Sequence, residues 1–187
     1  MNNSIAIDLN LSAKRLAHSR GVAETAIAIN KRYDLHCSDE KLYPTGLYHD
    51  IAREWDSEAL VRYAREHNLA VSEEEMAHPV LLHAPVGAAI LAQAGMDGQQ
   101  VLAVRHHTLG SSEMGTFGQI IFCADYIEPT RTYLDDTDRA RLLEEETIEA
   151  LCMKIIEREW RWRRDSGREV SLAGRAFYRY LEEERGR

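Results

Sequence analysis

The sequence is poor in the residues and segments that mark secreted and membrane proteins. Its 187 residues include only three cysteines, Cys37, Cys123 and Cys152, which are too few and too scattered for a disulfide framework. We therefore expect a reducing, cytoplasmic environment. No run of 18 apolar residues occurs, so we expect no membrane-spanning helix and no membrane partner. The first ten residues lack the basic and apolar segments of a signal peptide.

Positive charge is also scarce, with 23 Lys and Arg against 31 Asp and Glu and a net charge of −8. Nucleic-acid binding depends mainly on neutralising phosphates, so we expect no nucleic-acid partner. Residues 131–187 are nearly balanced, with 13 basic and 14 acidic side chains, and we interpret them as a solvated helical face held by ion pairs. The alternative, weakened by interleaved acidic residues, is a nucleic-acid patch built on Arg158, Arg161, Arg163, Arg164, Trp160 and Trp162.

Strand-type alternation is almost absent, whereas helix caps and helical spacing of apolar residues run along the whole chain. Ser72 and Glu75 form a capping box, Asp56 and Asp97 are N-cap candidates, and Pro44 should kink or restart its helix. The length suits one domain with its own core. The sequence predicts an all-α fold with helices over residues 11–33, 38–54, 56–67, 85–95, 97–107, 116–126, 138–164 (continuous, or broken near Thr147) and 171–185, the last capped by Ser171.

Histidine is absent from the last 80 residues, and all eight histidines lie within the first 107. A metal site in a helical protein collects nitrogen and oxygen ligands from different helices. His18 shares the expected buried face of its helix with Val22 and Ile29. The other candidates likewise stand near helix ends or on apolar faces. The full set of candidate ligands is His18, His49, Asp50, His83, His107 and Asp125.

Each candidate also has an ordinary explanation. His18 alone would be a hydrogen-bonded core histidine, and Asp125 would pair with an arginine or a backbone amide. His106 and His107 are about 100° apart on a helix, so only one of them faces a given site, and we choose His107. Cys123 lies roughly 200° from Asp125 around its helix and is expected in the core. The remaining histidines are interpreted as surface or turn residues: His36, His67 and His78.

The order of the candidates resembles that of the HD-domain metal-dependent phosphohydrolases. The HD signature itself matches His18, His49, Asp50 and Asp125, while His83 and His107 resemble the two further histidines of members that hold two metals. Five segments look like the YqeK branch, which comprises bacterial symmetrical diadenosine tetraphosphate hydrolases: HSRGVAETA at 18–26, YHDIAR at 48–53, HAPVGA at 83–88, HHTLG at 106–110 and ADYIEPTR at 124–131.

The resemblance implies a single-domain HD-type helical bundle over residues 1–187, with a di-metal site between helices, a metal-site core at about 11–131 and scaffold helices at about 138–185. The six candidates would hold two divalent ions, with Asp50 as the bridge. Their mixed ligand set suits iron or manganese, and we favour iron, with another transition metal as an alternative.

Two such ions would supply a bridging hydroxide that cleaves diadenosine tetraphosphate into two ADP. The resemblance implies that Asp50 and Arg53 are catalytic, and that Arg53, Arg131 and Thr108 contact the substrate. A homodimer is an open expectation.

One segment departs from the pattern of this branch. Residues 111–114 read SSEM where an Arg-Pro-Gly-Met-like stretch is usual, and Gly118-Gln119 replaces a Glu-Lys pair. Two positive groups are lost and Glu113 is added, which should weaken polyphosphate binding or change its preference. Two alternatives therefore stay open: a hydrolase of mononucleotides or guanosine alarmones, and a nucleotide-binding sensor that holds metals with little turnover. Packing is the expected role, and base stacking the alternative, for Trp55, Trp160 and Trp162.

Overall fold

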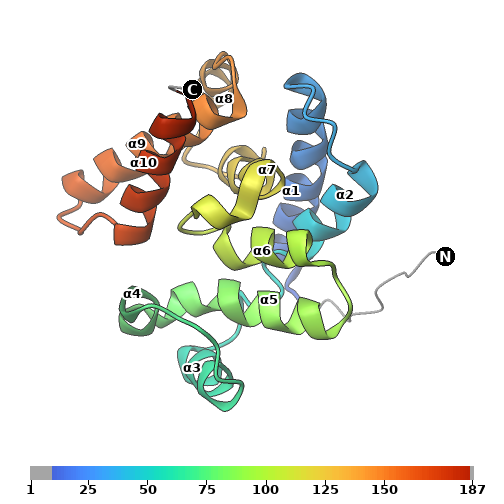
Figure 1. Cartoon of the computed structure of the whole chain (residues 1–187), viewed down its shortest axis with the longest axis vertical. Helices are drawn as coiled ribbons and strands as arrows, with labels where there is room; N and C mark the ends of the chain where they lie inside the picture. The colour runs from blue at the N-terminus through green and yellow to red at the C-terminus, as the bar shows by residue number, and fades with distance from the viewer. Residues whose placement is uncertain (1–9, 186–187) are drawn as a thin grey trace.

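The computed structural model describes residues 10–185, which form ten α-helices and two short 3₁₀-helices (Figure 1). No strand occurs among these residues, and the predicted all-α class is confirmed. The helices are α1 (Ala13–Arg32), α2 (Asp39–Tyr48), α3 (Ser57–Glu66), α4 (Glu73–Ala77), η1 (Pro79–Leu82), α5 (His83–Gln93), α6 (Gly98–His106), η2 (Ser112–Met114), α7 (Gly115–Ile127), α8 (Asp136–Leu142), α9 (Ile148–Asp165) and α10 (Leu172–Arg185).

Helix α7 lies at the centre of the molecule, with α1 and α2 on one side and α9 and α10 on the other (Figure 1). Every residue from Phe117 to Ala124 is buried, because this stretch is apolar on almost all sides and such a helix is stable only inside a core. Helix α6 packs on α7, and α5 packs on α6. The main core therefore surrounds the helix that carries Asp125.

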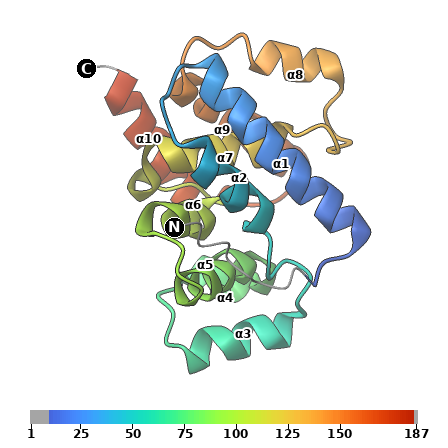
Figure 2. The same ribbon diagram turned by 90° about the vertical axis from the view of Figure 1, so that its right-hand side faces the viewer.

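A second apolar cluster joins α3, η1 and α5 through Leu60, Ala64, Leu82 and Val86. Figure 2 shows α3 and α8 at opposite ends of the molecule. None of the helices in the described part of the chain is both long enough and apolar enough to cross a membrane.

The charged segment predicted over residues 138–164 forms two helices, α8 and α9, so the alternative with a break near Thr147 is confirmed. The Thr147 hydroxyl accepts a hydrogen bond from the backbone N–H of Ala150 and begins α9. Arg158 pairs with Asp138 at 3.2 Å, and Arg163 pairs with Glu159 at 2.8 Å. Two arginines of this segment are therefore ion-paired, as the solvated-face interpretation predicts.

The predicted restart at Pro44 is wrong, because α2 continues through this residue to Tyr48. Two contacts support the helix there: the Thr45 hydroxyl and the Gln100 side chain both donate hydrogen bonds to the Lys41 carbonyl. Helix α2 also ends earlier than the predicted residue 54, so that His49 and Asp50 lie in the turns that follow it. The capping box at Ser72 is confirmed, as are the N-caps at Asp56, Asp97 and Ser171.

Close packing of α2 on α1 requires a glycine at position 46. A Cβ atom there would lie 2.6 Å from the Cα and 2.8 Å from the backbone nitrogen of Ala23, so the Gly46→Ala variant must separate the two helices. We expect a loss of about 1–3 kcal/mol in the free energy of unfolding, measured by urea denaturation. The matched control is Gly98→Ala, where nothing lies within 4 Å of the added atom. Equal stabilities of the two variants would contradict this account.

Candidate metal centre

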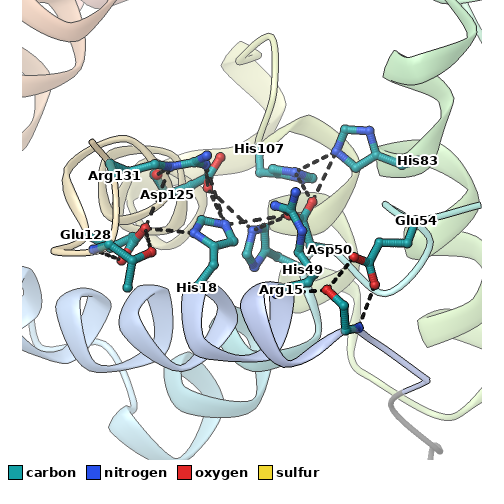
Figure 3. A network of polar contacts seen from close by, with 12 residues as sticks. Arg15, His18, His49, Asp50, Glu54, His83, His107, Asp125, Glu128 and Arg131 are labelled. Atoms are coloured by element: carbon teal, nitrogen blue, oxygen red, sulfur yellow. Dashed lines mark hydrogen bonds and ion pairs between the residues drawn. The ribbon is translucent and has the colours of Figure 1, made fainter. Parts of the chain in front are cut away.

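The six candidate ligands come together from five segments of the chain (Figure 3). His18 lies within α1, His49 and Asp50 directly follow α2, His83 begins α5, His107 follows α6, and Asp125 lies in the last turn of α7. Five of them are buried, and only Asp125 retains intermediate exposure. The ends of α2 and α6 and the start of α5 therefore point their polar residues at one place inside the protein.

Asp50 separates the imidazoles into two pairs. Its Oδ2 atom lies 3.5 Å from Nε2 of His18 and 3.5 Å from Nε2 of His49. Its Oδ1 atom lies 3.2 Å from Nε2 of His83 and 3.6 Å from Nε2 of His107. Asp125 joins the first pair, with its Oδ1 atom 3.0 Å from His18 Nε2 and 3.5 Å from His49 Nε2. One carboxylate thus faces two sets of nitrogen atoms with its two oxygens.

Every one of the four imidazoles is held by its other nitrogen. The Nδ1 atoms of His49, His83 and His107 donate hydrogen bonds to backbone carbonyls three residues earlier, those of Gly46, Val80 and Val104. His18 differs, because its Nδ1 atom donates to Glu128 Oε1 at 2.8 Å. Such contacts fix the tautomer and aim the free Nε2 atom at a metal.

The donor set fits divalent metal ions. Nε2 of His49 is buried and has no hydrogen-bond partner among the described residues, and a buried polar atom without a partner is rare unless something else binds it. Ligand atoms of His18, His49 and Asp125 lie within 4.8 Å of one another, and so do those of His49, Asp50 and His107. Imidazole and carboxylate ligands of this kind suit transition metals.

Glu128 and Arg15 belong to the site, although the sequence analysis assigned them no role. Glu128 is fully buried and accepts hydrogen bonds from the backbone and hydroxyl of Thr130 as well as from His18. Arg15 contacts Asp50 Oδ2 through Nη1 at 2.6 Å. Two signals pointed to them: Glu128 stands in the ADYIEP segment, and Arg15 precedes His18 by three residues on the same helix face.

The predicted substrate contacts lie around this cluster. Arg131 donates through Nη2 to Asp125 Oδ1 and through Nε to the Asp125 carbonyl. Thr108 directly follows His107 and lines a cavity with it. Arg53 is half-buried one turn after Asp50, and in the part of the chain that the structure describes its side chain makes no hydrogen bond or ion pair. The substrate-binding roles of these residues stay predictions.

The residues interpreted as bystanders lie away from the cluster. His36, His67 and His78 are exposed, while His106 faces Glu113, with 3.5 Å between Nε2 and Oε2. Cys123 is buried in the core, and its Sγ atom lies 3.3 Å from that of Cys152.

Electrostatics keep the candidate carboxylates ionised. Burial opposes the charge on Asp50, but the neighbouring imidazoles outweigh it and hold the pKa of this carboxyl well below its usual range. Burial also opposes the charge on His18, yet hydrogen bonds to Asp125, Asp50 and Glu128 raise its pKa to about 10. In the metal-free protein, His18 therefore carries a proton that a metal must displace.

This proton makes metal binding dependent on pH. Because the pKa of His18 is raised from 6.5 to about 10, its charge stabilises the metal-free protein fully below pH 6.5, and that contribution is lost as the pH rises through 10. Metal affinity should correspondingly rise with pH, by up to about tenfold per unit. We expect release of about one proton per protein at pH 8, measured by calorimetry in buffers of different ionisation enthalpy. The His36→Ala control should release as many protons as the wild type. If no proton is released from the wild type, His18 is not protonated in the metal-free protein.

Glu128 is expected to strengthen metal binding through His18. Gly21 of α1 leaves room for it, since a Cβ atom at that position would lie 2.5 Å from Glu128 Oε2. The Glu128→Gln variant keeps an acceptor oxygen and removes the charge that makes His18 a stronger ligand. We expect a fall in metal affinity of about 10- to 100-fold, measured by competition with a chelator. The control is Glu24→Gln on the exposed face of α1, and equal affinities in both variants would refute the role of Glu128.

Comparison with known proteins places the chain in a family. The family model described as HD domain matches residues 15–159. A solved structure described as a predicted HD superfamily hydrolase involved in NAD metabolism, from Clostridium acetobutylicum, has 28% sequence identity and a TM-score of 0.82, covering 94% of this chain and 92% of its own.

Curated relatives agree with this match. Three of them carry the name symmetrical bis(5'-nucleosyl)-tetraphosphatase. The protein from Halalkalibacterium halodurans is 36% identical over 138 residues, which cover 71% of this chain and 72% of the relative. The Bacillus subtilis protein is 32% identical over 153 residues, covering 78% and 77%, and the Staphylococcus aureus protein is 37% identical over 124 residues, covering 65% and 62%. The chain described here therefore belongs to the HD-domain family and is of the YqeK type.

Proposed function

We propose that this protein hydrolyses dinucleoside polyphosphates and cleaves diadenosine tetraphosphate symmetrically into two ADP. Three relatives named for this activity support the proposal. The observation that carries it is the position of Asp50, whose two oxygens face different pairs of imidazoles. A carboxylate in this position is suited to link two ions, which is the arrangement of many phosphate-ester and phosphoanhydride hydrolases.

In this proposal two divalent ions are held by the six residues of the cluster. His18, His49 and Asp125 would hold one ion, His83 and His107 would hold the other, and Asp50 would bridge them. We favour iron, with manganese or another transition metal as the alternative, because the ligands mix imidazole with carboxylate. When bound, such ions lower the pKa of water and polarise phosphoryl oxygens.

Arginine side chains would position the polyphosphate. Arg15 and Arg131 contact Asp50 and Asp125 respectively (Figure 3), each at the carboxylate oxygen that faces His18. Their side chains are 22% and 26% exposed, so both are partly open to solvent. A guanidinium binds phosphate oxygens with paired hydrogen bonds. We also propose that Arg53 acts in catalysis beside Asp50 and, with Thr108, contacts the substrate.

The reaction is hydrolysis of the central phosphoanhydride. The oxygen of one water joins one of the two middle phosphorus atoms, and the bond from that phosphorus to the bridging oxygen breaks. The bridging oxygen leaves with the other half of the substrate, so that both products are ADP. Because the leaving diphosphate is already a stabilised anion, the chain needs no dedicated general acid at that atom.

The cellular setting is also a proposal. The three cysteines are free thiols, which is typical of a reducing compartment, and we infer a cytoplasmic protein. The homodimer that the resemblance allows would be tested by light scattering.

Product identity tests the proposed function. Metal-loaded protein is incubated with diadenosine tetraphosphate, and we expect ADP as the sole product in chromatography. ATP plus AMP would contradict symmetrical cleavage. Tight binding of the dinucleotide without any product would favour the nucleotide-binding sensor. Faster product formation from mononucleotides or guanosine alarmones would favour the hydrolase of those substrates. His107→Ala and His106→Ala form a matched pair, in which only the first should lose metal and activity.

A further inference from the structure

A cavity extends from the candidate metal centre into the C-terminal part of the molecule. His107 and Asp125 line it, together with residues of α9 and α10. Its volume is about 90 Å³. The C-terminal helices, which the sequence analysis treated as scaffold, therefore also face the place where substrate would bind.

The wall of this cavity combines aromatic and polar side chains. Tyr126 and Trp160 supply aromatic surface, while Thr108, Glu159 and Arg163 supply polar groups. Glu159 Oε1 accepts a hydrogen bond from Arg163 Nε at 2.8 Å, and among the described residues its Oε2 atom accepts none. Aromatic faces beside hydrogen-bonding groups are the features that bind a heterocyclic base.

Trp160 is the tryptophan placed for such a role. Trp55 and Trp162 are 40% and 51% exposed, and neither lines the cavity. The Trp160 ring lies 4.9 Å from the ring of Tyr178, centre to centre. Tyr178 is itself held by a hydrogen bond from its hydroxyl to Glu157 at 2.8 Å. The indole thus has a supported position at the wall.

The size of the cavity selects part of a nucleotide rather than a whole one. A cavity of about 150 Å³ binds benzene, and a site that encloses a drug-sized ligand measures about 300–1,000 Å³. The volume of 90 Å³ found here is smaller than either value, so the cavity encloses only part of one planar ring system. Ribose and phosphates would lie outside it, toward His107 and Asp125.

We propose that this cavity binds one nucleobase of the substrate, stacked on Trp160 and bonded to the polar groups of α9. The proposal rests on the proposed function and extends it. The HD-domain match ends at residue 159, whereas Trp160, Arg163, Ser171 and Gly174 lie beyond it. In this view, the HD core supplies the reacting centre, and the segment that follows it recognises the base.

Gly174 allows the cavity to be filled without touching the metal centre. A Cβ atom at this position would meet its nearest neighbours, Ser171 Cβ, Leu109 O and Trp160 Nε1, at 3.6–3.7 Å. Gly174→Ala should therefore fit, whereas Gly174→Leu should occupy the base site. We expect Gly174→Leu to raise KM for diadenosine tetraphosphate by about five- to hundredfold, the range for loss of one base–aromatic stack. Metal content and circular dichroism should stay at the wild-type level in Gly174→Leu. The control Gly98→Ala, which lies outside the cavity and where nothing lies within 4 Å of the added atom, should keep the wild-type KM.

Tryptophan fluorescence gives a second test that does not depend on turnover. ADP added to the metal-loaded protein should quench the wild type and Trp162→Phe equally, and Trp160→Phe should lose the quenching. Quenching that persists in Trp160→Phe, or a wild-type KM in Gly174→Leu, would overturn the base site and leave the proposed function intact. If the wild type releases no ADP from the dinucleotide, the proposed function fails, and Trp160 quenching by ADP still decides the base site.

Discussion

The carboxylate of Asp50 is the group on which the arrangement of this protein depends. A carboxylate withdrawn from water is unfavourable unless charges or hydrogen-bond donors surround it, and Asp50 is only 3% exposed. Imidazoles from α1, α5 and the residues after α2 and α6 face it, and Arg15 closes one side. Satisfying this one buried charge therefore requires helices that are distant in the sequence to meet at the same place.

The same centre explains how an acidic protein can bind an anionic substrate. The chain has a net charge of −8, and some of its C-terminal basic residues are in ion pairs, such as Arg158 with Asp138. Two divalent ions would exceed the charge of Asp50 and Asp125 and leave a local positive field. Such a field acts over a few ångströms inside a low-dielectric site, where the screened surface charge contributes little.

Features that depend on neighbouring residues could be predicted from the sequence, whereas contacts between distant segments could be predicted only in part. The capping box at Ser72 and the N-cap at Asp97 depend on neighbouring residues and were predicted correctly. A restart at Pro44 was predicted wrongly: α2 continues through this residue, and Gln100 of another helix donates a hydrogen bond to the Lys41 carbonyl there. The motif resemblance grouped the six candidate ligands. It assigned no role to Arg15, and the place of Trp160 beside the centre required the packing of α9 on α7.

The four imidazoles differ in how far a mutation elsewhere in the chain can change their orientation. His49, His83 and His107 are oriented by main-chain carbonyls, which no side-chain replacement removes. His18 is oriented by Glu128, which a single nucleotide change can replace. A mutation at position 128, whether natural or engineered, could therefore change the properties of His18 as a ligand while the other three histidines keep their orientation.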